Sequence, residues 1–121
     1  MQQRPGPKYL LCGSRLTDET LLIRALLEGL NTQARQWTET ITILDDGSLQ
    51  GLEGEVDSFR YLEHRRVRDW ERSRPNIVLA FMDRLSHNRE TEKTLIRAES
   101  QGIPAYVISR YDGENFPHRP I

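Results

Sequence analysis

Strand-like segments alternate with helical patterns along this chain, and that alternation limits the available folds more than any other feature. Short apolar or β-branched runs are typical of buried strands, and four occur here: YLLC, TITILDD, NIVLAFM and AYVIS. Strands that are separated by helices run parallel, with right-handed crossovers and helices on both faces of the sheet. We therefore predict an α/β fold, a single-domain Rossmann-like three-layer sandwich with a mainly parallel sheet of about four strands.

Two of the connecting segments have clear helical patterns. The first has Thr17 as its predicted N-cap and apolar residues at helical spacing from Leu22 to Leu30. The second is predicted to begin in the cluster at residues 86–88 and to end before Gly102, because a glycine commonly follows the last turn of a helix.

The segment from Gly54 to Arg74 is harder to assign. Its apolar residues fit one helix with an irregular step between Leu62 and Val67, so we predict a long or kinked helix. A short strand around residues 60–62 is the alternative.

Length and charge bound the class of protein. The 121 residues and the hydrophobic content of 36% suit one modest core, which indicates a single domain. We place a flexible N-terminal tail at residues 1–7, the folded domain at 8–110 and a C-terminal tail at 111–121. The formal net charge of −1 gives no overall attraction to nucleic acid or to an acidic membrane, so any basic site is local.

The number of cysteines and the length of the apolar runs indicate in which cellular compartment the protein is expected. One cysteine cannot form an internal disulfide, no signal-peptide pattern opens the chain, and no apolar run approaches the roughly 18 residues of a membrane span. We therefore predict a soluble, cytoplasmic protein with no membrane partner. Cys12 falls in the first strand, where we interpret it as a core residue rather than a nucleophile.

The first strand ends in a hinge that could bind a ligand. In open α/β sheets, ligands bind beyond the carboxyl ends of the strands. Gly13 lets the backbone approach a ligand closely, Ser14 can donate to phosphate or ribose oxygens, and Arg15 supplies a charged fork. The alternative is a plain turn with a solvated arginine, because the full G-x-G-x-x-G pattern is absent.

The second hinge, DDGSLQGLEGEVDS, holds more glycine than a tight turn requires. We expect Gly47, Gly51 and Gly54 to line a phosphate or sugar pocket. Asp45 or Asp46 would then bind ribose hydroxyls. The alternative is a solvated loop. A metal site at the two adjacent acids is poorly supported, because adjacent carboxylates seldom converge, and we predict neither a metal nor a cofactor.

Two further segments carry donors. In HRRVRDWERSR, a helix would place Arg65, Arg68 and Arg72 on one face for a phosphate or a nucleic-acid backbone, although interleaved acids would partly neutralise it. A solvated helix face is the alternative there. In SHNRET, donors gather around a predicted helix N-terminus, while the two glutamates in the first turn can instead stabilise the helix dipole. The donors are His87, Asn88, Arg89 and Thr91.

The order of these segments matches a known pattern. It consists of CGSR after the first strand, a glycine-rich turn with a following aspartate after the second, an arginine-rich helix leading to the strand NIVLAFM, and a closing helix-GIP-strand unit. This order resembles the SLOG superfamily of Rossmann-like domains, which includes the DNA-processing DprA proteins and the Lonely Guy phosphoribohydrolases. The chain is most similar to the small YspA-like branch, over about Tyr9 to Ser109.

The resemblance implies ligand contacts in each hinge and also marks departures. The usual Gly-Gly-x-Gly-Thr becomes HNRET, and Lys93 stands where the phosphoribohydrolases have an acid, with Glu92 one step early. These changes count against glycosidic-bond chemistry but not against binding. The positions that the resemblance assigns to ligand contact are Gly13, Ser14, Arg15, Gly51, Gly54, Asp57, Arg65, Arg66, Arg68 and Thr91.

We predict a binding domain that senses or sequesters a nucleotide or a nucleotide-derived small molecule at the carboxyl edge of the sheet. The alternative is a nucleoside-monophosphate N-glycosidic bond hydrolase, with Glu92 or Asp57 as the catalytic carboxylate that helps water attack. A second alternative is weak nucleic-acid binding through the segment from Arg65 to Arg74. Whether the protein is an enzyme stays open.

We also predict a homodimer or a higher homo-oligomer. The first helix carries more leucine and isoleucine than one buried stripe requires, and a symmetric dimer is the commonest closed assembly. The predicted interface is this helix or the helix expected from Val56 to Trp70. Neighbouring helices or the two tails are the alternative cover for these side chains.

Overall fold

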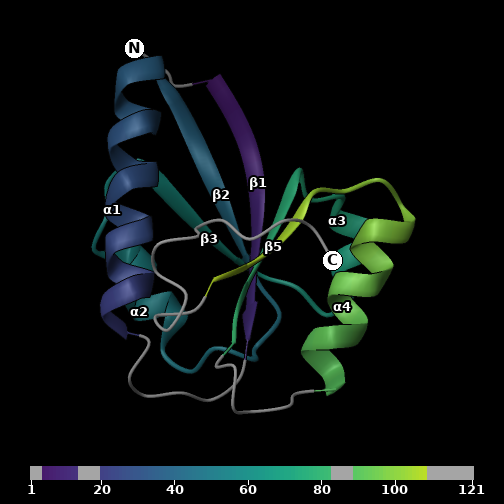
Figure 1. Ribbon diagram of the computed structural model, residues 1–121. Coiled ribbons are helices and arrows are strands. Elements are labelled where there is room, and N and C mark those ends of the chain that lie inside the picture. The colour runs from purple at the N-terminus through teal and green to yellow at the C-terminus, as the bar shows by residue number, and fades with distance from the viewer. Residues whose placement is uncertain (1–3, 14–19, 83–88, 109–121) are drawn as a thin grey trace.

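The computed structural model of the chain describes residues 4–13, 20–82 and 89–108. Within these residues, five strands form one parallel sheet in the order β3-β2-β1-β4-β5 (Figure 1). The Rossmann-like α/β fold is confirmed, with five strands in place of about four. The strands are β1 (Arg4–Gly13), β2 (Glu39–Asp45), β3 (Leu62–Arg66), β4 (Ile77–Phe81) and β5 (Ala105–Ile108).

Helices cover both sides of the sheet. We call the side that carries α1 (Thr20–Trp37) and α2 (Leu52–Asp57) the first face, and the side that carries α3 (Trp70–Ser73) and α4 (Arg89–Ser100) the second face (Figure 1). The helices α1 and α2 pack over β2 and β3, whereas α4 packs over β4 and β5. No helix in the described part of the chain is long and apolar enough to cross a membrane.

Side chains alternate between the two faces along each strand, and this alternation builds two cores. Along β1, Leu11 enters the core beneath α1 and α2, whereas Leu10 and Cys12 enter the core beneath α3 and α4. All three side chains are buried. Because a central parallel strand is buried on both faces, its residues form a continuous apolar run, as the sequence of this strand indicates.

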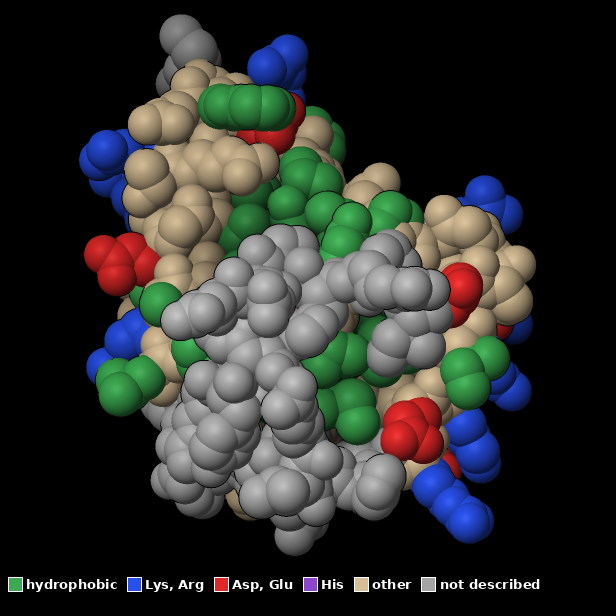
Figure 2. Space-filling view, viewed as in Figure 1, with side chains coloured by type: hydrophobic (Ala, Val, Ile, Leu, Met, Phe, Trp, Pro, Cys, Tyr) green, Lys and Arg blue, Asp and Glu red, His purple; other side chains and the backbone are tan. Residues whose placement is uncertain are grey.

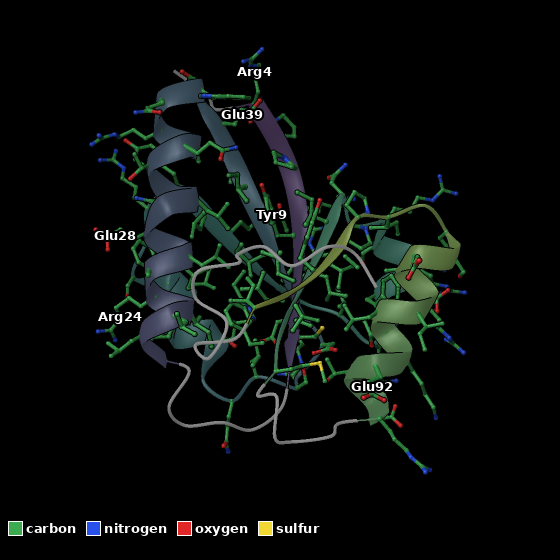
Figure 3. The ribbon with its side chains drawn as sticks, in the orientation of Figure 1. Arg4, Tyr9, Arg24, Glu28, Glu39 and Glu92 are labelled. Carbon is green, nitrogen blue, oxygen red and sulfur yellow. The ribbon has the colours of Figure 1, made fainter. Side chains whose placement is uncertain are left out.

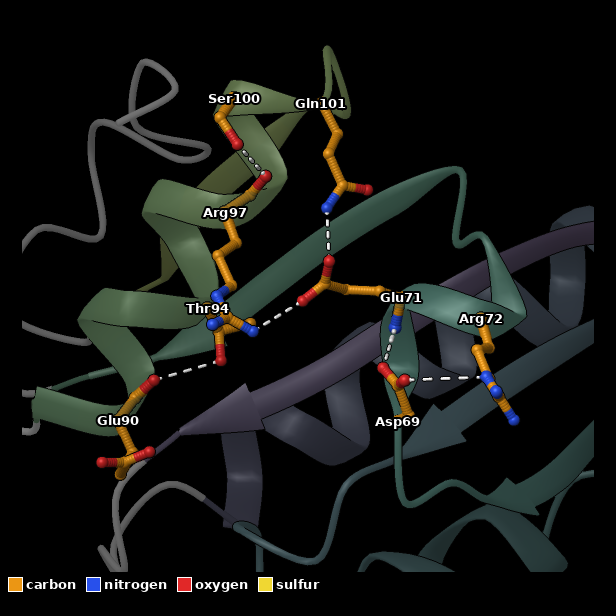
Figure 4. Close-up of polar contacts among 8 residues, drawn as sticks. All are labelled: Asp69, Glu71, Arg72, Glu90, Thr94, Arg97, Ser100 and Gln101. Carbon is orange, nitrogen blue, oxygen red and sulfur yellow. Dashed lines mark hydrogen bonds and ion pairs between the residues drawn. The ribbon is translucent and has the colours of Figure 1, made fainter.

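One glutamate on each face joins the two helices there through polar contacts. On the first face, Arg24 of α1 donates from Nε and Nη2 to the two carboxylate oxygens of Glu55 in α2, each at 3.1 Å. On the second face, Glu71 of α3 accepts from Arg97 Nη1 at 2.8 Å and from Gln101 Nε2 at 2.6 Å (Figure 4). Exposed ion pairs contribute little stability, so these contacts chiefly orient the short helices.

The long helix predicted from Gly54 to Arg74 is wrong, because this segment forms α2, β3 and α3. After α2 ends at Asp57, the chain turns, and Asn31 Oδ1 of α1 accepts the Tyr61 N–H at 2.8 Å. β3 then pairs with β2 and satisfies backbone groups on the outer side of β2, which a helix could not do. The alternative, a short strand around residues 60–62, has the correct type of element, and the structure places this strand at 62–66.

β1 begins at Arg4, earlier than the expected start of structure near Lys8. Arg4 and Pro5 pair with Glu39 and Thr40 of β2, and the register shifts between Pro5 and Lys8. Prolines lack the N–H that a ladder needs, which accounts for the irregular pairing here. Arg4 and Glu39 lie at the amino end of the sheet (Figure 3).

The predicted end of α4 is confirmed. Gly102 has a φ of 75°, its N–H donates to the Glu99 carbonyl at 3.0 Å, and the Ile103 N–H donates to the Ala98 carbonyl at 2.9 Å. This is the Schellman pattern that glycine favours after a helix. The predicted start of this helix at residues 86–88 lies outside the described residues, as does the predicted N-cap Thr17.

The sheet itself covers most of the apolar surface of α1. Ile23, Leu27 and Leu30 are buried in the core of the first face, and Leu22 and Leu26 pack against that core. Leu21, at 76% exposed, is the large apolar side chain of this helix that stays open near its start. The excess of leucine is therefore largely used within the chain, while the homodimer stays a prediction.

Two glycine-to-alanine substitutions should shift stability in opposite directions. A Cβ on Gly13 would lie 2.3 Å from the Phe81 carbonyl oxygen of β4, which is backbone and cannot turn aside, so Gly13→Ala should lower the free energy of unfolding by about 1–3 kcal/mol. Gly29 lies inside α1 with nothing within 4 Å of such a Cβ, so Gly29→Ala should raise it by about 1 kcal/mol. Urea unfolding measures the free energy of unfolding of both variants. Equal changes in the two would contradict the strand packing described here.

Candidate functional site

The strand order places a candidate site at the carboxyl edge of the sheet. The order reverses at β1, which lies between β2 and β4, and ligands of such sheets bind at this reversal. Of the hinge after β1, the structure describes Gly13, while Ser14 and Arg15 lie outside the described residues. His87 and Asn88, after β4, also lie outside them. The described part of the site therefore comes from the end of β1, the turn after β2, the segment from β3 to α3, and α4.

A buried carboxylate, Asp45, organises the end of β2. One of its oxygens accepts the Gly47 N–H at 2.8 Å, and the other lies 2.8 Å from His64 Nε2 of β3. The side chains of Asp45 and His64 are only 3% and 9% exposed, and Arg66 Nη1 lies 4.0 Å from the same carboxylate. The oxygens of Asp45 are therefore already engaged inside the protein, and the ribose contact by Asp45 or Asp46 stays a prediction.

Asp46 and Ser48 tie the same turn to β1. Asp46 Oδ1 accepts the backbone N–H of Ser48 at 3.0 Å and the hydroxyl of Ser48 at 2.5 Å. Ser48 Oγ in turn accepts the N–H of Gly13 at 3.0 Å. The ends of β1 and β2 and the middle of β3 are thus joined through one hydrogen-bonded set of residues, which we call the strand-end network: Gly13, Asp45, Asp46, Gly47, Ser48 and His64.

The three glycines of the second hinge have different roles. Gly47 has a φ of 90°, and a Cβ there would lie 2.3 Å from Arg66 Nη2, so the guanidinium group packs against this turn. Gly51 has a φ of 80° and is the N-cap of α2. Gly54 lies inside α2 and is exposed. Only the first of the three lines the cleft described next.

A cleft of about 540 Å³ lies between the strand-end network and α4. The turn after β2 forms one wall, and the first turns of α4 form the other. The loop before α3 contributes Arg68, and α3 contributes the buried ring of Trp70, its first residue. Acidic, basic and hydroxyl side chains all reach it. The lining residues are Asp46, Gly47, Ser48, Arg68, Trp70, Glu90, Thr91, Lys93, Thr94 and Arg97.

The charges in the cleft differ in how they are paired. Arg97 is bound to Glu71 at 2.8 Å (Figure 4), and Lys93 Nζ lies 3.6 Å from Glu90 Oε1. Arg68 is exposed and makes no ion pair with another residue of the described ranges. Its guanidinium group is therefore the basic group of this cleft that is most available to an anion.

The structure gathers some of the residues predicted from sequence and separates others. Asp46, Gly47, Arg68 and Thr91 line the cleft together. The predicted helix face of arginines does not exist, because Arg65 and Arg66 belong to β3, Arg68 to a loop and Arg72 to α3. The remaining predicted residues outside the lining are Gly13, Gly51, Gly54, Asp57, Arg89 and Glu92, so neither proposed catalytic residue lines the cleft.

Sequence reasoning missed part of the lining. Ser48 lies in the second hinge and is absent from the predicted set, although a serine two residues after an aspartate is typical of a side-chain-stabilised turn. Glu90, Thr94 and Arg97 recur at the spacing of one helix face, which is the signal that could have predicted them as a group.

A larger cavity of about 680 Å³ lies at the opposite edge of the sheet. Its lining comes from the segments that precede β4 and β5, which places it at their amino ends, away from the hinges. Glu71, which lines it, already accepts hydrogen bonds from Arg97 and Gln101 (Figure 4). We therefore place the candidate site in the smaller cleft.

Cys12 lies beneath the site and is buried, with Sγ 3.9 Å from the Leu79 carbonyl. Burial raises the pKa of its thiol far above the ordinary value, and the negative charge of Asp46 adds to the increase. A thiol with a raised pKa is a poor nucleophile, which agrees with its interpretation as a core residue.

No group of three or more histidine, cysteine, aspartate or glutamate side chains in the described ranges could hold a metal ion. Comparison of the chain with family models, curated proteins and solved structures found no match. The resemblance to SLOG domains therefore stays a prediction.

Removal of the Ser48 hydroxyl should destabilise the network. Ser48→Ala leaves the buried N–H of Gly13 without its acceptor, so we expect a loss of about 1–3 kcal/mol in the free energy of unfolding. Ser58→Ala is the matched control, because that hydroxyl bonds the Gly54 carbonyl on the exposed surface at the end of α2. Urea unfolding compares the two, and equal small losses would show that the network contributes no stability.

The thiol of Cys12 should be unreactive in the native protein. Because burial raises its pKa, the thiolate is depleted at pH 8 relative to a free cysteine, and the side chain is also inaccessible. A disulfide reagent such as DTNB should modify it only after unfolding in denaturant. Rapid modification without denaturant would mean that this strand is not buried as described.

Proposed function

We propose that this protein binds a nucleotide or a nucleotide-derived small molecule in the cleft at the carboxyl edge of its sheet, as a sensor or a sequestering protein. The observation that carries the proposal is Arg68, a basic side chain that has no ion-pair partner in the described residues and lines the same cleft as Asp46. A phosphate would pair with Arg68, and ribose hydroxyls would donate to the carboxylate of Asp46.

The size and composition of the cleft support this ligand class. About 540 Å³ falls within the range of roughly 300–1,000 Å³ that is typical of small-molecule sites. Ser48 and Thr94 supply hydroxyl groups that can both donate and accept. The first turns of α4, whose positive dipole end favours an anion, form the neighbouring wall.

The resemblance to SLOG domains supports the same ligand class, since it assigns Arg68 and Thr91 to ligand contact. The two alternatives lack a comparable observation. Glu92 and Asp57 do not line the cleft, which leaves the hydrolase without an assigned acid there. The arginines from 65 to 74 are distributed over a strand, a loop and a short helix, and three of them lie within 4.0 Å of an acidic side chain. Strong nucleic-acid binding is therefore disfavoured.

A thermal-shift panel tests the proposal. Nucleotides, cyclic nucleotides and ADP-ribose derivatives at millimolar concentration and low salt should include at least one compound that raises Tm, because a ligand at about a hundred times its Kd stabilises by about 2.7 kcal/mol. Arg68→Gln should weaken that compound's binding roughly 10- to 100-fold, the cost of a charged hydrogen bond.

Arg65→Gln is the matched control for that measurement. Arg65 is a half-exposed arginine three positions away that pairs with Glu63 at 3.5 Å and does not line the cleft. Its substitution should leave affinity unchanged. If no compound in the panel shifts Tm of the unaltered protein, the proposed function is refuted.

A further inference from the structure

Part of the first face carries apolar side chains beyond the helices that cover it. α1 and α2 pack over β2 and β3, whereas β1, β4 and β5 present Tyr9, Ile77, Tyr106 and Ile108 on the same side. These four residues are only partly buried, and we call them the open apolar face. Figure 2 shows hydrophobic side chains gathered in this region, and Figure 3 shows Tyr9 between α1 and β5.

The corresponding open part of the second face has the opposite character. There β2 and β3 lie beyond α3 and α4, and the side chains of β3 on that side are Glu63 and Arg65, which are 53% and 49% exposed. Water solvates such a polar surface without cost. An open surface with two tyrosines and two isoleucines is different, because grouped apolar side chains in a soluble protein mark a contact surface.

We propose that residues 109–121 of the same chain pack along the open apolar face. β5 is the edge strand that borders this face, and it ends at Ile108, so the chain continues directly from the border. The sequence that follows carries three large apolar side chains, Tyr111, Phe116 and Ile121. Pro117 and Pro120 in the same stretch disfavour a regular helix, so an extended path suits it.

The length of this segment is sufficient for the contact. At about 3.3 Å per extended residue it reaches roughly 40 Å. The full width of the five-stranded sheet is roughly 20 Å at about 4.8 Å between neighbouring strands. The segment can therefore cross from β5 over β4 and β1 to the side of α1.

A second copy of the chain is the rival occupant, and mass action favours the attached segment. A short tether holds a segment at an effective concentration of about millimolar. A second copy at micromolar concentration is at a disadvantage of roughly a thousandfold for the same surface. The inference is independent of the proposed ligand, because the open apolar face does not include the cleft lining.

A paramagnetic label on the full chain tests the proposal. Asn115→Cys provides one accessible thiol, since Cys12 is buried, and a nitroxide attached there reports which side of the sheet the segment follows. We expect the backbone amide signals of Leu22 and Leu26, on the first face, to lose intensity. The signals of Leu95 and Ala98, on the second face, should keep theirs. Equal effects on both helices, or none, would overturn the proposal.

A mixed sample separates the two occupants. Nitroxide-labelled protein without isotope is added to isotope-labelled protein without nitroxide, so only contacts between copies can broaden the spectrum. No broadening in α1 is expected at micromolar concentration. Selective broadening there would identify a second copy as the occupant and would overturn the proposal.

A pair of substitutions gives an independent measurement. Phe116→Ser should lower Tm by roughly 4 °C, the size expected when a protein of this length loses one modest apolar contact, and should increase the fluorescence of an added apolar dye. Asn115→Ser, a substitution at the neighbouring position, should change neither Tm nor the dye fluorescence. Identical results from the two variants would overturn the proposal.

Discussion

The carboxylate of Asp45 is the constraint on which the carboxyl edge of this sheet depends. A buried carboxylate is costly unless its oxygens are paired, and here the turn after β2 and the imidazole of His64 both approach it. That requirement sets the path of the chain after β2. This path places the hydroxyl of Ser48 where it accepts the N–H of Gly13. The result is an edge in which β1, β2 and β3 share one hydrogen-bonded unit, against which a ligand cleft can form.

The central part of the fold could be predicted because burial on two faces leaves a strong pattern. β1 and β4 appear as continuous apolar runs, and Gly102 marks the end of α4. β3 could not be recognised in the same way. It lies at the edge, and its residues Leu62 to Arg66 are mostly charged, so the pattern resembles an exposed helix as much as a strand. Its identity is decided by pairing with β2, which is a contact distant in sequence.

The candidate site was predictable only in part, for a related reason. A hinge at a strand end is visible in the sequence, which is why Asp46 and Gly47 were predicted. Which of two adjacent aspartates turns inward depends on the strand's register and on the partner His64, and neither is local. The wall formed by α4 depends on how that helix is rotated on the sheet, which Leu95 and Ala98 decide by entering the core.

The charged character of β3 has a consequence for how this protein behaves in a crowded solution. An edge strand offers unpaired backbone groups to any other extended chain, which is the first step toward fibrous aggregates. Glu63, Arg65 and Arg66 are about half or more exposed along this edge. A chain that docked there would bring its own backbone against three charged side chains and strip their water. The segment that is hardest to recognise as a strand is thus the one best suited to end a sheet.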